Sequence, residues 1–103
     1  MERSVIIIGS GLGGLECGCI LAKKGFRVTI LERASKPGGC LQSFRRGGRI
    51  FDTGLHYVGG LGEGQSLRPF FEYFGLMDLP WKQINPDCVD EIVIGGQSSP
   101  LAS

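Results

Sequence analysis

A cluster of glycines near the start of the chain, together with one acid, has the residue types needed to bind a dinucleotide. Gly9, Gly11 and Gly14 satisfy the spacing GxGxxG, and Glu32 follows at the interval typical of this motif. Glycines allow a sharp turn and let a pyrophosphate approach the backbone, while a helix N-terminus offers unpaired N–H groups. A carboxylate at Glu32 would accept hydrogen bonds from both ribose hydroxyls and repel a 2′-phosphate, which disfavours NADP.

The glycine-rich turn therefore predicts a phosphate cradle formed by Gly9, Gly11, Leu12, Gly13 and Gly14. The alternative is a turn that binds nothing. We disfavour it because the strand before the turn, the helix after it and the later acid all agree with the motif.

Short apolar runs and one amphipathic segment must position this cradle. Residues 5–8 and 28–31 are buried strands by composition, and residues 12–24 form a helix that ends at Gly25. Strand, helix and strand in this order predict a βαβ unit with a right-handed crossover. The fold class is α/β, the N-terminal part of a doubly wound Rossmann-like domain.

The remaining elements are shorter and rich in turns. We predict a hairpin with strands at 41–44 and 49–52 around Gly47-Gly48, and a helix that Ser66 caps and Gly75 ends. Residues 77–88 read as a connector, 89–94 as a strand and 97–103 as a frayed polar end. We assign residues 1–65 to the dinucleotide-binding domain and residues 66–103 to the incomplete start of a substrate-binding or cap region.

A second motif distinguishes the two common dinucleotides. Arg33 and the doublet Gly38-Gly39 follow Glu32, and this arrangement resembles the extended fingerprint of flavoproteins. The resemblance implies FAD, with the doublet near the pyrophosphate and flavin. Many such proteins have an arginine after the doublet. Here that position is Cys40, which removes an arginine-mediated phosphate contact.

Two longer stretches, residues 38–44 (GGCLQSF) and 51–60 (FDTGLHYVGG), resemble the phytoene desaturase superfamily, including retinol saturase and carotenoid isomerase-like proteins. The resemblance implies a flavin-dependent oxidoreductase acting on carbon–carbon double bonds of an extended apolar substrate. It also implies that the chain is an N-terminal piece, inactive alone. Two alternatives stay open: a flavin amine oxidase-type enzyme, and a non-catalytic nucleotide-binding or assembly module.

Several residues near these motifs have two readings. His56 is either a proton donor near flavin or substrate, or a histidine packed in a glycine-rich loop, and we favour the second. Cys40 and Ser43 are assigned to the cofactor site, with Cys40 as a small neutral spacer. An aromatic cluster either forms core or lines an apolar channel, with core as the default; its members are Leu67, Phe70, Phe71, Phe74 and Trp81.

The composition of the chain limits the kinds of partner and metal that it is expected to bind. The net charge of +1 gives no field to attract nucleic acid, and four cysteines without a CxxC pair, beside a single histidine, disfavour a metal site. We expect reduced thiols and a cytoplasmic protein. The arginines at the predicted hairpin tip, Arg45, Arg46 and Arg49, read as a solvated turn, and peripheral membrane contact stays open. Uncovered apolar faces leave self-association open as well.

Overall fold

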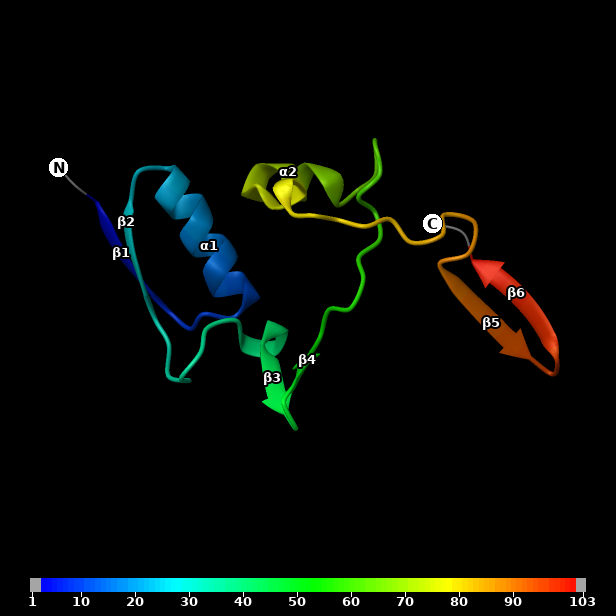
Figure 1. Cartoon of the computed structure of the whole chain (residues 1–103). Coiled ribbons are helices and arrows are strands. Elements are labelled where there is room, and N and C mark those ends of the chain that lie inside the picture. Colours follow the sequence, from blue (N-terminus) through cyan, green and yellow to red (C-terminus); the bar gives the residue numbers. More distant parts are fainter. Residues whose placement is uncertain (1–2, 102–103) are drawn as a thin grey trace. The chain divides into compact units, whose positions relative to one another are not determined.

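The computed structural model describes residues 3–101. The strands are β1 (Ser4–Ile8), β2 (Arg27–Leu31), β3 (Ser43–Arg46), β4 (Arg49–Asp52), β5 (Asp90–Ile94) and β6 (Gln97–Leu101) (Figure 1). The helices are α1 (Leu12–Lys23) and α2 (Arg68–Phe74), with 3₁₀ turns η1 (Gly39–Leu41) and η2 (Leu76–Asp78). The chain divides into two compact units between Tyr57 and Val58. The functional boundary after residue 65 stays a prediction.

The first unit is built on the predicted βαβ unit. β1 and β2 pair in parallel, with Ser4 opposite Arg27 and Ile8 opposite Leu31. Both strands are rich in β-branched residues, and their side chains alternate between exposed and half-buried. Helix α1 runs along one face of the strand pair (Figure 1). The strand–helix–strand order confirms the α/β prediction for this part of the chain.

Helix α1 ends where the glycine and lysine pattern predicts. Gly25 has φ +82° and donates its N–H to the carbonyl of Ala22 at 3.0 Å. Phe26 donates to the carbonyl of Leu21 at 3.1 Å. These two bonds form a Schellman motif, which satisfies carbonyls that the last helical turn leaves unpaired. Because the helix stops there, the chain can reverse directly into β2.

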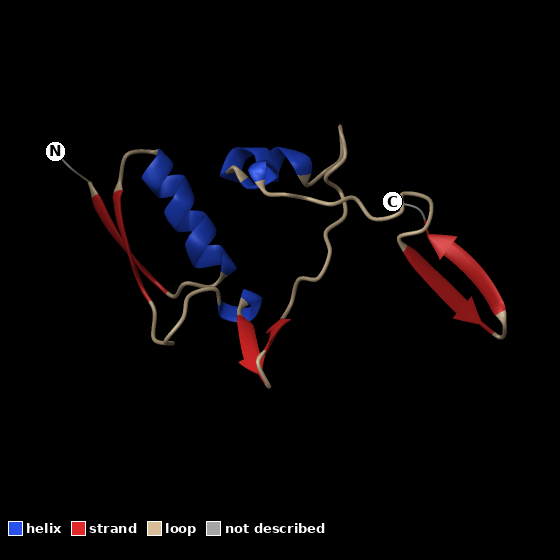
Figure 2. Cartoon of the chain, in the orientation of Figure 1, coloured by secondary structure: helices blue, strands red, loops and turns tan. Residues whose placement is uncertain are grey.

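A hairpin formed by β3 and β4 follows the βαβ unit (Figure 2). Its turn is Gly47-Gly48, as predicted, and the rings of Phe44 and Phe51 stack across it at 5.2 Å between centroids. The predicted start of the first strand at residue 41 is wrong. Residues 39–41 form the 3₁₀ turn η1 instead, because Gly38 and Gly39 both take left-handed backbone angles that curl the chain.

The second unit begins with helix α2, and one detail of its prediction needs correction. Ser66 does not cap this helix. The residue at the cap position is Leu67, and no side chain bonds there. The N–H groups of Leu67 and Arg68 donate instead to the carbonyl of Gly60, each at 3.1 Å. Gly75, with φ +73°, ends the helix as predicted.

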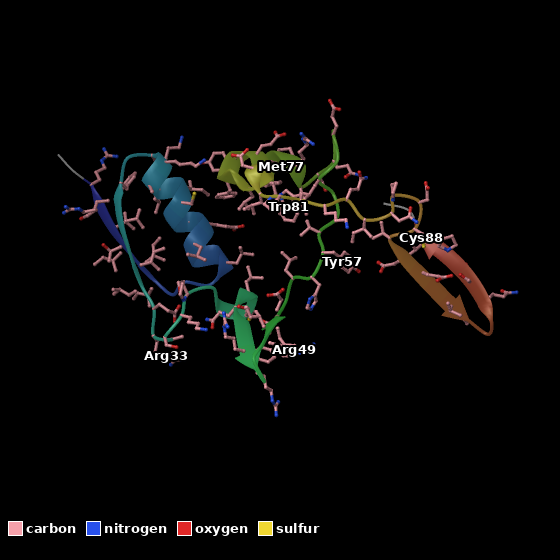
Figure 3. The ribbon with its side chains drawn as sticks, viewed as in Figure 1. Arg33, Arg49, Tyr57, Met77, Trp81 and Cys88 are labelled. Carbon is pink, nitrogen blue, oxygen red and sulfur yellow. The ribbon has the colours of Figure 1, made fainter. Side chains whose placement is uncertain are left out.

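The aromatic cluster gathers around the end of α2. Trp81 lies on the segment after η2 (Figure 3) and donates its indole N–H to the carbonyl of Leu76 at 2.7 Å. Its ring packs on Phe71 at 5.5 Å between centroids. Phe70, however, is 61% exposed. The default prediction of a buried aromatic core is therefore wrong within the described residues.

Strands β5 and β6 form a second hairpin around Gly95-Gly96, with Ile94 opposite Gln97 (Figure 2). The prediction of a frayed end is wrong for residues 97–101, and residues 102–103 lie outside the described range. Pro100 fits because a two-stranded ribbon has only edge strands, where a missing N–H can face solvent.

Within residues 3–101, neither unit encloses a hydrophobic core. No apolar side chain in residues 3–101 is fully buried. On the strand pair of the first unit, Ile6 and Ile8 are 67% and 88% exposed, and Leu31 is 52% exposed. The sheet is therefore covered by α1 on one face only. Among the described residues, no helix has the length and apolar character needed to cross a membrane.

Candidate dinucleotide-binding site

Two glycine-rich turns meet at the carboxyl ends of β1 and β2. Gly9 donates its N–H to the carbonyl of Leu31 at 2.7 Å, which extends the parallel pairing by one residue. Gly38 donates to the carbonyl of Ser10 at 2.8 Å. A Cβ on Gly39 would lie 3.0 Å from the Cα of Gly11. Ligands of parallel α/β sheets bind at this edge, so the fold brings the two sequence motifs to one place.

The third glycine of the motif holds α1 against the turn. A Cβ on Gly14 would lie 2.1 Å from the carbonyl oxygen of Gly9, closer than any real contact. One turn later, a Cβ on Gly18 would lie 3.0 Å from Cδ1 of Ile30. Because these two residues have no side chain, the backbone of α1 can pack directly against the turn and the strands. The N-terminus of α1 therefore lies at the end of the glycine-rich turn.

The middle of the turn is open. Cβ atoms built on Gly11 and Gly13 would have no neighbour within 4 Å. Gly11 is also the N-terminal cap residue of α1, and no side chain bonds to the helix end there. The open space beside Gly11 and Gly13 and the unpaired N–H groups of the first helical turn therefore fit the close approach of a diphosphate, as a dinucleotide requires.

Glu32 is held at this edge by hydrogen bonds from Ser10 and Ala34. Its Oε2 accepts from the N–H of Ser10 at 2.8 Å and from the Ser10 hydroxyl at 2.6 Å. Its Oε1 accepts from the N–H of Ala34 at 2.7 Å. The Ser10 hydroxyl, followed by the N–H groups of Ala34 and Ser10, lowers the pKa of Glu32 from 4.5 to about 2. The carboxylate is thus fully ionised at neutral pH.

Ser10 is the site residue that the sequence reasoning missed. It occupies a variable position of GxGxxG, where the motif prescribes no residue type. In the structure it is 3% exposed and bonds to Glu32 and to Gly38. A hydroxyl residue between the glycines, combined with an acid at the end of the next strand, is the pattern that could have revealed it.

Other predicted site residues lie around the turns with fewer contacts. Leu12 begins α1 and is 54% exposed. Arg33 lies on the loop after β2 (Figure 3), and its backbone N–H also lowers the pKa of Glu32. Ser43 begins β3 and is exposed. His56 lies in an exposed loop, and within residues 3–101 no hydrogen bond or ion pair joins it to this edge.

Cys40 is tied to the segment after β4 through its backbone. The hydroxyl of Thr53 can donate to the carbonyl of Cys40 at 3.1 Å or to that of Gln42. A Cβ on Gly54 would lie 2.8 Å from the Cys40 carbonyl oxygen. The Thr53-Gly54 turn therefore packs against η1, directly after the Gly38-Gly39 doublet. The Cys40 thiol is free and exposed.

The chain was compared with families of known proteins. The model of the NAD(P)-binding Rossmann-like domain matches residues 7–74, which include both glycine motifs and Glu32. That stretch is more than half of the 103-residue chain.

Individual relatives carry the names of a reductase, an isomerase and a desaturase. All-trans-retinol 13,14-reductase of Homo sapiens is 43% identical over 84 residues, 82% of this chain and 14% of that protein. Chloroplastic prolycopene isomerase 1 of an Oncidium hybrid cultivar is 37% identical over 86 residues, 84% of this chain and 14% of that protein. Phytoene desaturase (neurosporene-forming) of Rhodobacter capsulatus is 46% identical over 54 residues, 52% of this chain and 10% of that protein.

The chain thus spans about 14% of the length of the retinol reductase and the isomerase. The matching names are those of the superfamily indicated by residues 38–44 and 51–60. From the site geometry and these matches together, the chain belongs to the NAD(P)-binding Rossmann-like domain family and is similar to retinol reductases, prolycopene isomerases and phytoene desaturases.

Proposed function

We propose that this chain holds the adenosine diphosphate half of FAD in a flavin-dependent oxidoreductase. The observation that carries the proposal is the meeting of three elements at one edge: the open Gly11 turn, the ionised Glu32 and the Gly38-Gly39 loop. The N–H groups of α1 would bind the pyrophosphate, and Glu32 would accept a hydrogen bond from the ribose. A 2′-phosphate would meet the Glu32 carboxylate and be repelled.

FAD is favoured over NAD by the loop after β2. Its doublet lies against Gly11 and is tied to Ser10, so the loop borders the phosphate region. Arg33 and the doublet match the flavoprotein fingerprint described above. Bound FAD would supply the hydride chemistry. This chain's residues would bind and orient the adenosine end.

The substrate class comes from the relatives. Their names refer to retinol, prolycopene and phytoene. We propose an extended apolar polyene as the substrate of the complete enzyme, with reaction at a carbon–carbon double bond. Residues 66–103 would begin the region that binds it, and the exposed Phe70 and Trp81 would contribute apolar surface there.

The test is an absorption spectrum of the purified chain after incubation with FAD and desalting. We expect a retained flavin band that ADP displaces, NAD displaces weakly and NADP does not displace. The test variant is Gly11→Ala, which adds one Cβ in the open part of the turn and should lose the band. NAD retained in preference to FAD would overturn the assignment of the cofactor, and equal binding by the variant would overturn the site.

A further inference from the structure

Ser10 is the only polar residue that is buried within residues 3–101, at 3% exposure. Its N–H and its hydroxyl both donate to the same oxygen of Glu32, at 2.8 and 2.6 Å. Its carbonyl accepts from Gly38 at 2.8 Å. One small residue thus joins the turn after β1, the end of β2 and the Gly38-Gly39 loop.

Glu32, in contrast, is exposed, and its long side chain would move among rotamers if nothing held it. The two Ser10 donors occupy Oε2, and the Ala34 N–H takes one acceptor position on Oε1. The carboxylate is nevertheless exposed, so a ligand can still approach it. Removing the Ser10 hydroxyl would delete one of these bonds and leave both Ser10 backbone bonds in place.

We propose that Ser10 is a positioning residue, whose hydroxyl fixes the Glu32 carboxylate in the orientation that receives the ribose of the dinucleotide. The proposal rests on the proposed function for the ligand, but the contact itself can be tested without one. All the groups that lower the Glu32 pKa are hydrogen-bond donors, namely the Ser10 hydroxyl and the N–H groups of Ala34, Ser10 and Arg33. The charged Arg33 side chain is not among them.

The first experiment uses the chain without cofactor and follows the amide resonance of Ala34 by NMR as the pH falls. This N–H bonds to Glu32 and not to Ser10, so it reports on the carboxylate. We expect no titration step near 4.5 in the parent chain, since the Glu32 pKa is about 2. Ser10→Ala should move the step toward 4.5, and Ser10→Thr, which keeps the hydroxyl, should move it back.

Ser35→Ala is the matched control, because Ser35 is an exposed serine in the same loop as Ala34. It should titrate like the parent chain. If Ser10→Ala also titrates like the parent, the hydroxyl does not hold Glu32, and the proposal is wrong. If Ser10→Thr does not fold, the comparison of Ser10→Ala with Ser35→Ala still decides.

The second experiment measures FAD affinity by flavin fluorescence in a double-mutant cycle. Ser10→Ala should weaken binding about tenfold, the usual effect of losing a hydrogen bond to a charged group. In a Glu32→Gln background the same change should have little further effect, because Ser10 acts through Glu32. An equal loss in both backgrounds would overturn the positioning role. If the parent chain binds no FAD, the proposed function fails, while the Ala34 titration still tests the contact.

Discussion

At the scale of single residues, the four glycines of the first turn have different physical roles. The carbonyl of Gly9 stands where Gly14 would place a Cβ, whereas the Cβ positions of Gly11 and Gly13 are open. The motif thus combines a position where packing requires glycine with positions where a Cβ would meet no protein atom. Substitution by alanine can separate the two.

We predict opposite outcomes for Gly11→Ala and Gly14→Ala. Gly11→Ala should keep the circular dichroism and urea midpoint of the parent but weaken FAD binding roughly a hundredfold, the effect of losing about two charge-assisted hydrogen bonds. Gly14→Ala should lose about 3 kcal/mol or more of stability, because the helix must move away from the Gly9 carbonyl. Equal loss of stability in both variants would contradict this division.

The lowered pKa of Glu32 predicts that the stability of the folded chain depends on pH. Its pKa in the folded chain, about 2, lies below the ordinary 4.5. A lowered pKa gives a contribution that is fully present above 4.5 and is lost as the pH falls toward 2. The urea midpoint of the parent chain should therefore fall more steeply between these values than that of Glu32→Gln. Parallel curves for the two chains would show that the carboxylate is not held.

At this scale the sequence predicted the glycines and Glu32 but not Ser10. The glycine positions follow from backbone geometry, which any dinucleotide turn imposes. The role of Ser10 depends on its side chain pointing toward Glu32 at the end of β2. The spacing of the motif does not indicate where that side chain points.

At the scale of elements, the packing of α1 on the strands depends on Gly18. A Cβ built on Gly18 would point toward Ile7, Val28 and Ile30. It would lie 3.0 Å from Cδ1 of Ile30 and 3.5 Å from Cδ1 of Ile7. The end of the Ile30 side chain can shift slightly, so the structure can accommodate the single methyl group of alanine at position 18. A branched residue is not.

We therefore predict that Gly18→Val destabilises the first unit by about 1–3 kcal/mol, the usual cost of overpacking, while Gly18→Ala costs less. The urea midpoint measured by the helical circular dichroism signal would separate the two variants. Cys17→Val is the control for β-branching in the helix, since Cys17 is exposed. An effect of Cys17→Val as large as that of Gly18→Val would mean that helix propensity, not packing, is responsible.

The two hairpins show why one was predicted and the other was not. Both turn through a Gly-Gly pair with positive φ at each residue, 56° and 74° at Gly47-Gly48 and 58° and 80° at Gly95-Gly96. The first pair is flanked by Phe44 and Phe51, which mark strands. The second is followed by Gln97, Ser98, Ser99 and Pro100, whose types indicate a loop. Pairing with β5 overrides that weak local preference.

Gly96→Val should open the second hairpin, because a β-branched residue is strained by about 1–2 kcal/mol at this backbone angle. A two-stranded ribbon has little stability to spare. Cross-strand NMR contacts such as those between Val93 and Ser98 should disappear. They should persist in Gly96→Asn, since asparagine tolerates the angle. Contacts that survive in the valine variant would contradict the turn geometry.

At the scale of the whole molecule, the exposed apolar surface is the main feature. Ile6, Ile8 and Leu31 lie on the strand pair of the first unit and are all more than half exposed. The half-buried strand residues contact α1, so the pairing register fixes which side chains remain outside. Such a patch favours association.

We predict that the isolated chain self-associates through this surface. Analytical ultracentrifugation over a range of concentrations should show oligomers for the parent chain and a shift toward monomer for Ile8→Glu. Glu16→Lys, a charge change at an exposed position of α1, is the control and should behave like the parent. A monomeric parent chain at all concentrations would contradict the prediction.

The contacts that build the nucleotide site also bear on the order of folding. Ser10 meets Glu32 and Gly38, and Gly39 meets Gly11, so the whole cradle lies within the first 40 residues. These contacts close loops of 22 residues between Ser10 and Glu32 and of 28 residues between Ser10 and Gly38 (38 − 10), and the entropy cost of closing a loop grows only slowly with its length. During synthesis, the site can therefore assemble as soon as β2 and its loop leave the ribosome. A nucleotide could then bind before the later segments are synthesised. The bound nucleotide would stabilise the arrangement of β1, α1 and β2 while the rest of the chain folds.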